Sequence, residues 1–364
     1  VPGLLLRTGR HQDALACLRA FALKESQGMV PNRFDDYGED PHYNSVDASL
    51  WFLHACTEYL GATGDSAGFE EHLQQACVNV VHGYMRGTRF GIRMDPESGL
   101  LQGGDEHTQL TWMDAKRDGV VMTPRHGRPV EVNALWYHGL SRLSVTLSES
   151  GETDLADELG ALANKVMRSF QDEFYNPIHQ RLHDCLVEQE DGTFHPSTEV
   201  RCNQVFAASL DPSPLNWKQR KEVVEDVRAH LLTPYGLRTL RPGSDGYIGR
   251  FQGNMMERDR AYHNGTVWPY LLGAYCEAAL RVANHEGTLT ETCQHIADVV
   301  SPLIAQMNTG CLGQVAEIYD GDEPQHEHGC PAQAWSIAEL LRSVSLLLFY
   351  KSKIASKCSE NPGA

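Results

Sequence analysis

Hydrophobic and polar positions alternate with a helical period over most of the chain. Apolar residues recur three and four positions apart, which places them on one face of a helix. The pattern predicts helices over residues 11–25, 45–62, 68–86, 131–149, 153–174, 217–231, 265–284, 287–307 and 332–351, with a short apolar piece near 203–210. The period-two alternation of strands is scarce, although residues 181–195 fit a small hairpin around "EDG".

The connections between these stretches fall into two kinds. Some are tight turns, such as "GATGD" (61–65), "ESGET" (149–153) and "NHEGT" (284–288). Others are long segments rich in Gly, Pro, Trp, Tyr and Asp, at 25–45, 87–130, 232–264 and 308–331. Loops this long are uncommon unless they are functional. The alternation therefore favours an all-α toroid of helical hairpins, with a structural rim of short turns and a second rim that carries a site.

Composition narrows the choice of partners. The 364 residues are 41% hydrophobic and carry a net charge of −17, from 31 basic and 48 acidic residues. The acidic balance argues against nucleic acid and anionic membranes as partners, and no apolar run is long enough to span a bilayer. The ten cysteines contain no C-x-x-C pair, so we expect reduced thiols and a cytoplasmic protein. The oligomeric state is left open.

The sequence gives little support for a metal site or a cofactor site. "QHEHGC" (325–330) is rich in ligand types, but its spacing fits no standard zinc finger. The chain contains no P-loop, no dinucleotide fingerprint, no H-E-x-x-H and no G-x-S-x-G elbow. We expect neither a metal nor a cofactor.

The long loops share a composition suited to sugar. Four of the six tryptophans lie in or beside them, and acids and amides accompany each one: Trp51, Trp112, Trp268 and Trp335. Aromatic rings stack on the apolar face of a pyranose, while carboxylates and amides bind its hydroxyls. For any single one of these tryptophans a core position is the better explanation, but four in parallel contexts favour a sugar site. Among the scattered histidines, His263 is the most site-like.

Hydrolysis of a glycosidic bond needs one protonated and one ionised carboxyl group. Asp114 in "QLTWMDAKRDG" is a candidate acid, because the apolar neighbour Trp112 favours a raised carboxyl pKa. Glu317 in the last long loop is a candidate base. Spacing alone does not separate this pair from its competitors, which are Asp47, Asp105, Glu131, Glu257 and Asp259.

Five collinear motifs carry a family resemblance. "PHYNSVDASLWF", "TWMDAK", "GRPVEVNALWYHGL", "YHNGTVWPYLLGAY" and "GCPAQAWSIAELLR" resemble the amylo-α-1,6-glucosidase domain of glycogen debranching enzymes, especially of the bacterial and archaeal type. The resemblance extends from "PGLLLRTGR" to about Arg342. It implies an (α/α)6 barrel that hydrolyses α-1,6-linked glucose at the branch stubs of glycogen or limit dextrin, with inversion.

The resemblance also implies roles for individual residues. The Asp of the family's T-W-M-D motif is its general acid and falls on Asp114, and its general base falls on Glu317. An inverting mechanism predicts that these two carboxyls lie about 6.5–9.5 Å apart. Asn44 and Asp47 are expected to bind sugar hydroxyls, and Trp112, Trp268 and Trp335 to form walls or platforms. The other expected pocket residues are Trp51, Lys116, Glu131, His263, Asn264 and Gln333.

One departure concerns the start of the chain. The family carries a D-W-G-R-D-like motif before "PGLLL", whereas this sequence begins at Val1. We expect a fragment that lacks an N-terminal domain and the opening of the barrel, and that is poorly active alone. The expected organisation is one catalytic domain over residues 1–350 followed by a solvated tail at 351–364.

Two alternatives remain open. The first is another α-glucoside hydrolase of the same fold, similar to glucoamylase or trehalase. The second is a carbohydrate-binding protein without turnover.

Overall fold

The computed structural model describes residues 1–35, 40–310 and 313–360, and the side chains within this part up to residue 356. Parts of the long loops at 25–45 and 308–331, part of the predicted tail, and Cys311 lie outside the described residues. The chain forms two compact units, each treated by itself below. The first comprises Val1–Pro177, Leu182–Thr198 and Leu210–Pro214, and the second comprises Ile178–Arg181, Glu199–Ser209 and Leu215–Ala364.

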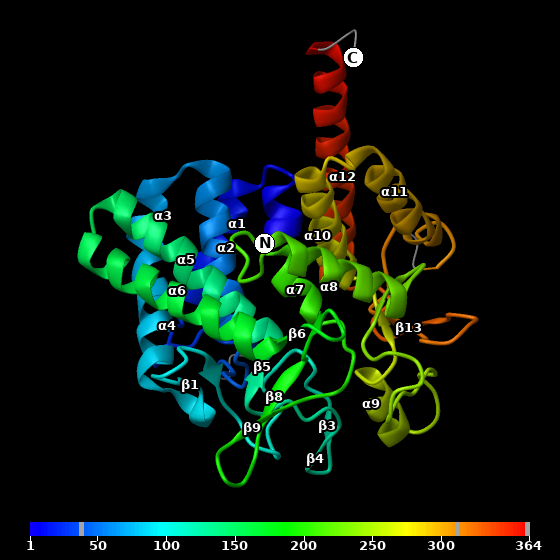
Figure 1. The fold of residues 1–364 in the computed structure, drawn as a ribbon, viewed down its shortest axis with the longest axis horizontal. Helices are drawn as coiled ribbons and strands as arrows, with labels where there is room; N and C mark the ends of the chain where they lie inside the picture. Colours follow the sequence, from blue (N-terminus) through cyan, green and yellow to red (C-terminus); the bar gives the residue numbers. More distant parts are fainter. Residues whose placement is uncertain (36–39, 311–312, 361–364) are drawn as a thin grey trace. The chain divides into compact units, whose positions relative to one another are not determined.

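The first unit is built mainly from helices, and α5 and α6 form its largest hairpin (Figure 1). Its helical elements are a π-helical turn η1 (Pro2–Leu6), α1 (His11–Ala22), α2 (Ala48–Thr63), α3 (Ser66–His72), α4 (Gln74–Arg86), a 3-10 turn η2 (Arg89–Gly91), α5 (Val130–Ser150) and α6 (Thr153–Phe174).

The helix α6 shows why these stretches fold as they do. Its buried residues lie three or four positions apart, so they form one continuous apolar stripe: Ala156, Leu159, Ala163, Val166, Phe170 and Phe174. The helix α5 ends at Ser150 and is capped by Gly151, whose φ of +91° suits a residue without a Cβ atom, and α6 begins two residues after this glycine. The predicted tight turn at 149–153 is confirmed.

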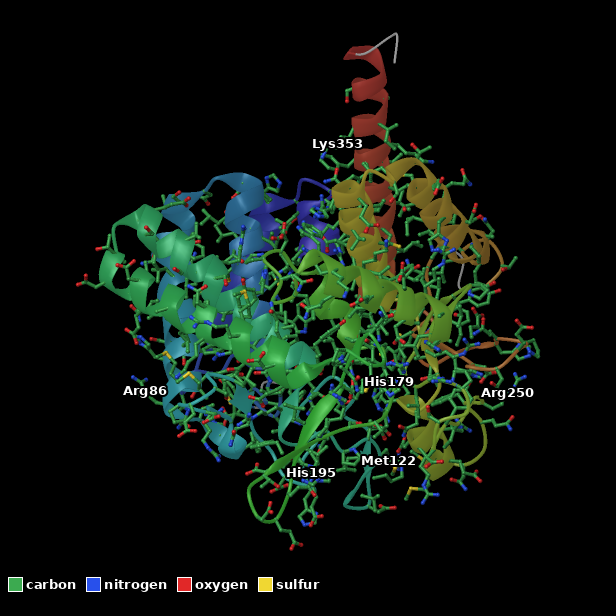
Figure 2. The ribbon with its side chains drawn as sticks, in the orientation of Figure 1. Arg86, Met122, His179, His195, Arg250 and Lys353 are labelled. Carbon is green, nitrogen blue, oxygen red and sulfur yellow. The ribbon has the colours of Figure 1, made fainter. Side chains whose placement is uncertain are left out.

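Short strands lie within the long loops of both units. Those before residue 200 are β1 (Arg93–Met94), β2 (Leu101–Gln102), β3 (Lys116–Arg117), β4 (Val120–Val121), β5 (Arg128–Pro129), β6 (Tyr175–Asn176), β7 (Arg181–Leu182), β8 (Cys185–Glu188) and β9 (Phe194–Pro196). The pair β8–β9 is antiparallel, with Val187 opposite His195 (labelled in Figure 2), and β5 joins it on the other edge. The hairpin predicted within 181–195 is therefore confirmed.

The second unit combines helices with an antiparallel sheet. Its helices are α7 (Gln204–Ser209), α8 (Trp217–His230), α9 (Met255–Tyr262), α10 (Leu271–Glu286), α11 (Leu289–Gln306) and α12 (Ala334–Glu360). Its strands, in the order of the sheet, are β10 (Leu232–Thr233), β11 (Gly236–Arg238), β12 (Val267–Trp268), β13 (Ile318–Tyr319) and β14 (Glu327–His328). The helix α10 packs against α7, α8, α11 and α12, so it forms the centre of this unit.

Several predicted boundaries were wrong. The helix predicted over 68–86 is divided at Leu73 into α3 and α4, and the one predicted from 265 begins at Leu271 because β12 occupies the residues before it. The last helix continues to Glu360 rather than ending at 351, and its final turns project beyond α10 and α11 in Figure 1. None of the helices within the described residues is long and apolar enough to cross a membrane. The single catalytic domain over 1–350 stays a prediction.

Candidate active site

Asp47 organises the loop that carries Asp114. Asp47 stands at the N-terminus of α2 and its side chain is buried. Its Oδ2 accepts a hydrogen bond from the backbone N–H of Trp112 at 2.9 Å, and the Ser45 hydroxyl donates to its Oδ1. Burial raises the pKa of Asp47, and the nearby charge of Asp114 raises it further. Both oxygens accept hydrogen bonds from within the protein, so Asp47 positions the loop. Its contact with a sugar hydroxyl stays a prediction.

The candidate acid Asp114 follows this anchor by two residues. Met113 beside it is buried, whereas the Asp114 side chain is exposed. The surrounding protein still removes part of the hydration of the carboxyl, and this raises the pKa of Asp114. The loop is closed by the hairpin β3–β4 and by a hydrogen bond of 2.9 Å from the backbone N–H of Met122, labelled in Figure 2, to the carbonyl of Ala115. Asp114 thus combines access to solvent with a raised pKa.

An open pocket of about 680 Å³ lies beside Asp114, within the range of about 300–1,000 Å³ typical of small-molecule sites. The backbone N–H of Asn44 donates to Asn32 Oδ1 at 3.2 Å, which fixes one wall. Asn44 and Asp114, two of the predicted site residues, therefore share one pocket. The lining residues are Asn32, Arg33, Pro41, His42, Tyr43, Asn44, Arg89, Phe90 and Asp114.

The other predicted residues of the first unit differ in their accessibility. Trp51 and Trp112 are half-buried, and the ring of Trp51 packs edge-on against His54 at 5.6 Å. Lys116 is exposed, but its ammonium donates to the carbonyl of His107 at 2.7 Å. These three side chains remain candidates for contact with a ligand.

Glu131 has a structural role instead. Only 1% of it is exposed, and both of its oxygens accept hydrogen bonds from the guanidinium of Arg125. The Nε of Arg125 also donates to Asp184 at 2.7 Å. A buried carboxylate is stabilised by such a charge partner. The sequence does not reveal this ion pair between distant segments, and the expected role of Glu131 as a pocket wall stays a prediction.

The candidate base Glu317 lies in the second unit, directly before β13. The hydroxyl of Tyr262 donates to its Oε1, and the backbone N–H of Cys330 donates to its Oε2 at 2.6 Å. The backbone N–H of Glu317 donates in turn to the Cys330 carbonyl at 2.9 Å. The half-buried carboxylate therefore has a fixed orientation, and both oxygens act as acceptors, as suits an ionised group.

Gly329 makes room for the Glu317 carboxylate. Its φ is +72°, and a Cβ atom at this position would lie 2.4 Å from Glu317 Oε2. Only glycine combines this conformation with this close approach at little cost. The segment between β14 and α12 is thus shaped around the candidate base.

An aromatic cluster lies beside Tyr262. The His263 ring stacks on Trp268 at 5.2 Å, and Trp268 Nε1 donates to the Tyr262 carbonyl at 3.1 Å. His263 is 0% exposed and Trp268 2%. Both side chains therefore belong to the core that supports the site, and their contact with a sugar stays a prediction. Trp335 is 36% exposed, and its ring stacks on Tyr270 at 4.3 Å; its role as a platform also stays a prediction.

Two predicted amides complete the second unit. Asn264 is half-buried; its Oδ1 accepts from Arg201 at 2.8 Å and its Nδ2 donates to the Arg260 carbonyl at 2.8 Å. Gln333 precedes α12, where its side-chain oxygen accepts from the N–H of Ala334 at 3.1 Å. Both amides thus serve local structure, and their contact with a sugar stays a prediction.

Sequence reasoning missed Tyr262 and the helix α9 that ends with it. A signal was present, because Asn254 and Glu257 form a reciprocal capping box at the start of α9. The five-stranded sheet was also missed, since strands of two or three residues leave almost no alternation to detect. Asp114 and Glu317 belong to different units, and their predicted separation stays a prediction.

Comparison with known proteins identifies the family. The sequence profile described as amylo-alpha-1,6-glucosidase matches residues 1–342. The glycogen debranching enzyme of Saccharomyces cerevisiae is 23% identical over 436 residues, a match that covers 93% of this chain and 28% of that protein. The chain thus spans well under half the length of this relative.

A solved structure extends the comparison to the fold. The neutral trehalase Nth1 from Saccharomyces cerevisiae is similar with a TM-score of 0.65 at 14% identity, over 98% of this chain and 71% of that one. At this identity the similarity concerns the fold alone, and it supports the predicted (α/α)6 class; closure of the helical ring stays a prediction. The match over residues 1–342 places the chain in the amylo-alpha-1,6-glucosidase family.

Proposed function

We propose that the chain hydrolyses the α-1,6 bond of single glucosyl stubs on a branched glucan, as the glucosidase of a glycogen debranching system. Membership of a glycosidase family supports the reaction class. The observation that carries the proposal is the contrast between two carboxyls. Asp114 has a raised pKa beside an open pocket, whereas Glu317 accepts hydrogen bonds on both oxygens.

The reaction follows from these two environments. Asp114 donates its proton to the glucosidic oxygen as the bond to the anomeric carbon breaks. Glu317 accepts a proton from a water molecule, whose oxygen forms the new bond on the opposite face. The products are glucose with inverted configuration and a glucan chain with a free 6-hydroxyl. Proton exchange with solvent then returns Asp114 to its acid form and Glu317 to its carboxylate.

Each supporting residue has a part in this scheme. The hydrogen bond from the backbone N–H of Trp112 to Asp47 fixes the loop, so that the Asp114 carboxyl keeps a defined position. Tyr262 and the N–H of Cys330 orient Glu317, and this reduces the reorganisation needed when it takes up a proton. Trp335, stacked on Tyr270, offers an exposed apolar face for a sugar ring.

The test is a comparison of linkages. Glucose release is measured with a phosphorylase limit dextrin, with a linear α-1,4 maltooligosaccharide and with trehalose. We expect the limit dextrin to be the best substrate. Faster release from the α-1,4 chain or from trehalose would assign the chain to another α-glucosidase activity. Dextrin binding without any glucose release would make it a glycan-binding protein.

A further inference from the structure

Phe90 has an unusual backbone conformation. It lies inside the 3-10 turn η2 with φ +60° and ψ +24°, the left-handed region that favours glycine. A bulky residue is rare there, because its Cβ atom crowds the following carbonyl. Strain of this kind persists where the surrounding structure enforces it, and it is concentrated at functional sites.

The neighbours of Phe90 hold the turn firmly. The carbonyl of Phe90 accepts a hydrogen bond from the N–H of Gly104 at 2.9 Å. The guanidinium of Arg89 lies 4.3 Å from the centre of the Tyr43 ring and donates to the Ser26 hydroxyl at 3.0 Å. The N–H of Thr88 donates to the Ile92 carbonyl at 2.8 Å. The backbone is therefore fixed on both sides of the strained residue.

The Phe90 side chain itself is not part of the core. It is 44% exposed, and within the described residues no aromatic ring packs against it. Its ring lines the same pocket as Asp114 and Asn44. Packing does not explain why a strained position should carry an exposed aromatic ring at this place. A ring that meets the apolar face of a sugar does explain it.

The pocket indicates which part of the substrate the ring would meet. Its lining includes Asp114, the candidate acid. A general acid donates its proton to the oxygen of the leaving group, so the part of the substrate next to the acid includes the chain that departs. A pocket lined by Asp114 therefore fits the departing chain.

We propose that Phe90 is a specificity-determining residue whose ring stacks on a glucosyl unit of the departing glucan chain. This inference rests on the proposed function, in which Asp114 protonates the departing oxygen. The substrate class follows directly: the ring favours substrates whose leaving group is a glucan chain over those with a small leaving group.

The experiment compares variants on two substrates. Phe90→Gly removes the ring and relieves the strained conformation, and Phe90→Tyr keeps a ring. Phe34→Ala is the matched control, because Phe34 is 41% exposed in the same unit and packs on Phe21 outside the pocket. The substrates are the limit dextrin and α-D-glucosyl fluoride, which carries no sugar on the leaving side.

We expect Phe90→Gly to lower kcat/KM on the limit dextrin by roughly tenfold, the scale of one lost aromatic contact. Its kcat/KM on the fluoride should stay close to wild type and its thermal midpoint should not fall, since glycine suits the left-handed conformation, and Phe90→Tyr should retain most of the dextrin activity. Equal losses on both substrates, no loss on the dextrin, or the same loss in Phe34→Ala would overturn the proposal.

Binding separates this proposal from the proposed function. The dissociation constant for limit dextrin is measured by calorimetry in the Glu317→Gln background, with and without Phe90→Gly. A weakening of roughly tenfold supports the stacking role even if the wild-type chain releases no glucose, the result that would contradict the proposed function alone. An unchanged dissociation constant overturns the role of Phe90.

Discussion

The loop of Asp114 and the strand end of Glu317 hold their carboxyls by different means. The Asp114 loop is tied through its backbone, by the bond from the N–H of Trp112 to the buried Asp47, and its carboxyl is left exposed beside a pocket. Glu317 is held through the carboxylate itself, by Tyr262 and by the N–H of Cys330. The difference matches the two tasks, because an acid benefits from reduced hydration and a base from donors that fix the ionised form.

The largest expected effect is on the base. Glu317→Gln keeps the shape of the side chain but removes its ability to accept a proton. We expect kcat on limit dextrin to fall by about 10³-fold, as for the loss of a general base, while calorimetry shows dextrin affinity near wild type. Activity within tenfold of wild type would remove Glu317 from this role.

Substitution of the acid, unlike substitution of the base, should cause a loss of activity that depends on the leaving group of the substrate. Asp114→Asn should lower kcat/KM on limit dextrin by about 10²-fold, with a much smaller loss on α-D-glucosyl fluoride, whose leaving group needs little protonation. Steady-state rates on the two substrates provide the measurement. Equal losses on both would contradict the assignment of Asp114 as proton donor.

Removing one donor to the base should have a smaller effect. Tyr262→Phe deletes the hydroxyl that donates to Glu317, and we expect a fall in kcat of about tenfold with little change in KM. The matched control is Tyr235→Phe in the same unit, because Tyr235 is half-buried and stacks on Tyr319 at 4.6 Å, and within the described residues its hydroxyl makes no hydrogen bond to Glu317. Equal effects of the two substitutions would leave Tyr262 with a packing role only.

Gly329 tests whether the backbone around Glu317 matters by itself. Gly329→Ala should cost about 1–2 kcal/mol in the free energy of unfolding for the left-handed conformation, and should also lower kcat through the contact with the carboxylate. Gly243→Ala has a similar φ of +82° and nothing within 4 Å of the added Cβ atom, so it should lower stability alone. Denaturant unfolding and kcat, measured on both variants, separate the two effects.

The smallest expected effect concerns stability. Burial raises the pKa of Asp114 in the folded state, so folding takes up protons between the ordinary carboxyl pKa and the raised one, and stability falls as pH rises through this window. Asp114→Asn should therefore be more stable than wild type at pH 7, with the gain vanishing below the ordinary pKa. The thermal midpoints of wild type and variant are measured across this pH range. A gain in stability that did not depend on pH would contradict the account.

The sequence predicted the helical framework well and the details of the site less well. The apolar stripe of α6 is visible in the sequence because three- and four-residue spacing persists for the whole helix. The burial of Glu131, His263 and Trp268 was not visible in the sequence, because it depends on contacts between segments that are distant along the chain. Tyr262 was missed for the same reason, because it is distant along the chain from Glu317, the residue to which its hydroxyl donates a hydrogen bond.

The most direct test of the central claim is the configuration of the first glucose released. Proton NMR follows the anomeric signals of glucose during hydrolysis of a limit dextrin, before mutarotation mixes the two forms. If Glu317 acts as a base on water opposite Asp114, the first product is β-glucose. Initial release of α-glucose would mean retention of configuration, and would contradict the assignment of the two carboxyls as acid and base of an inverting reaction.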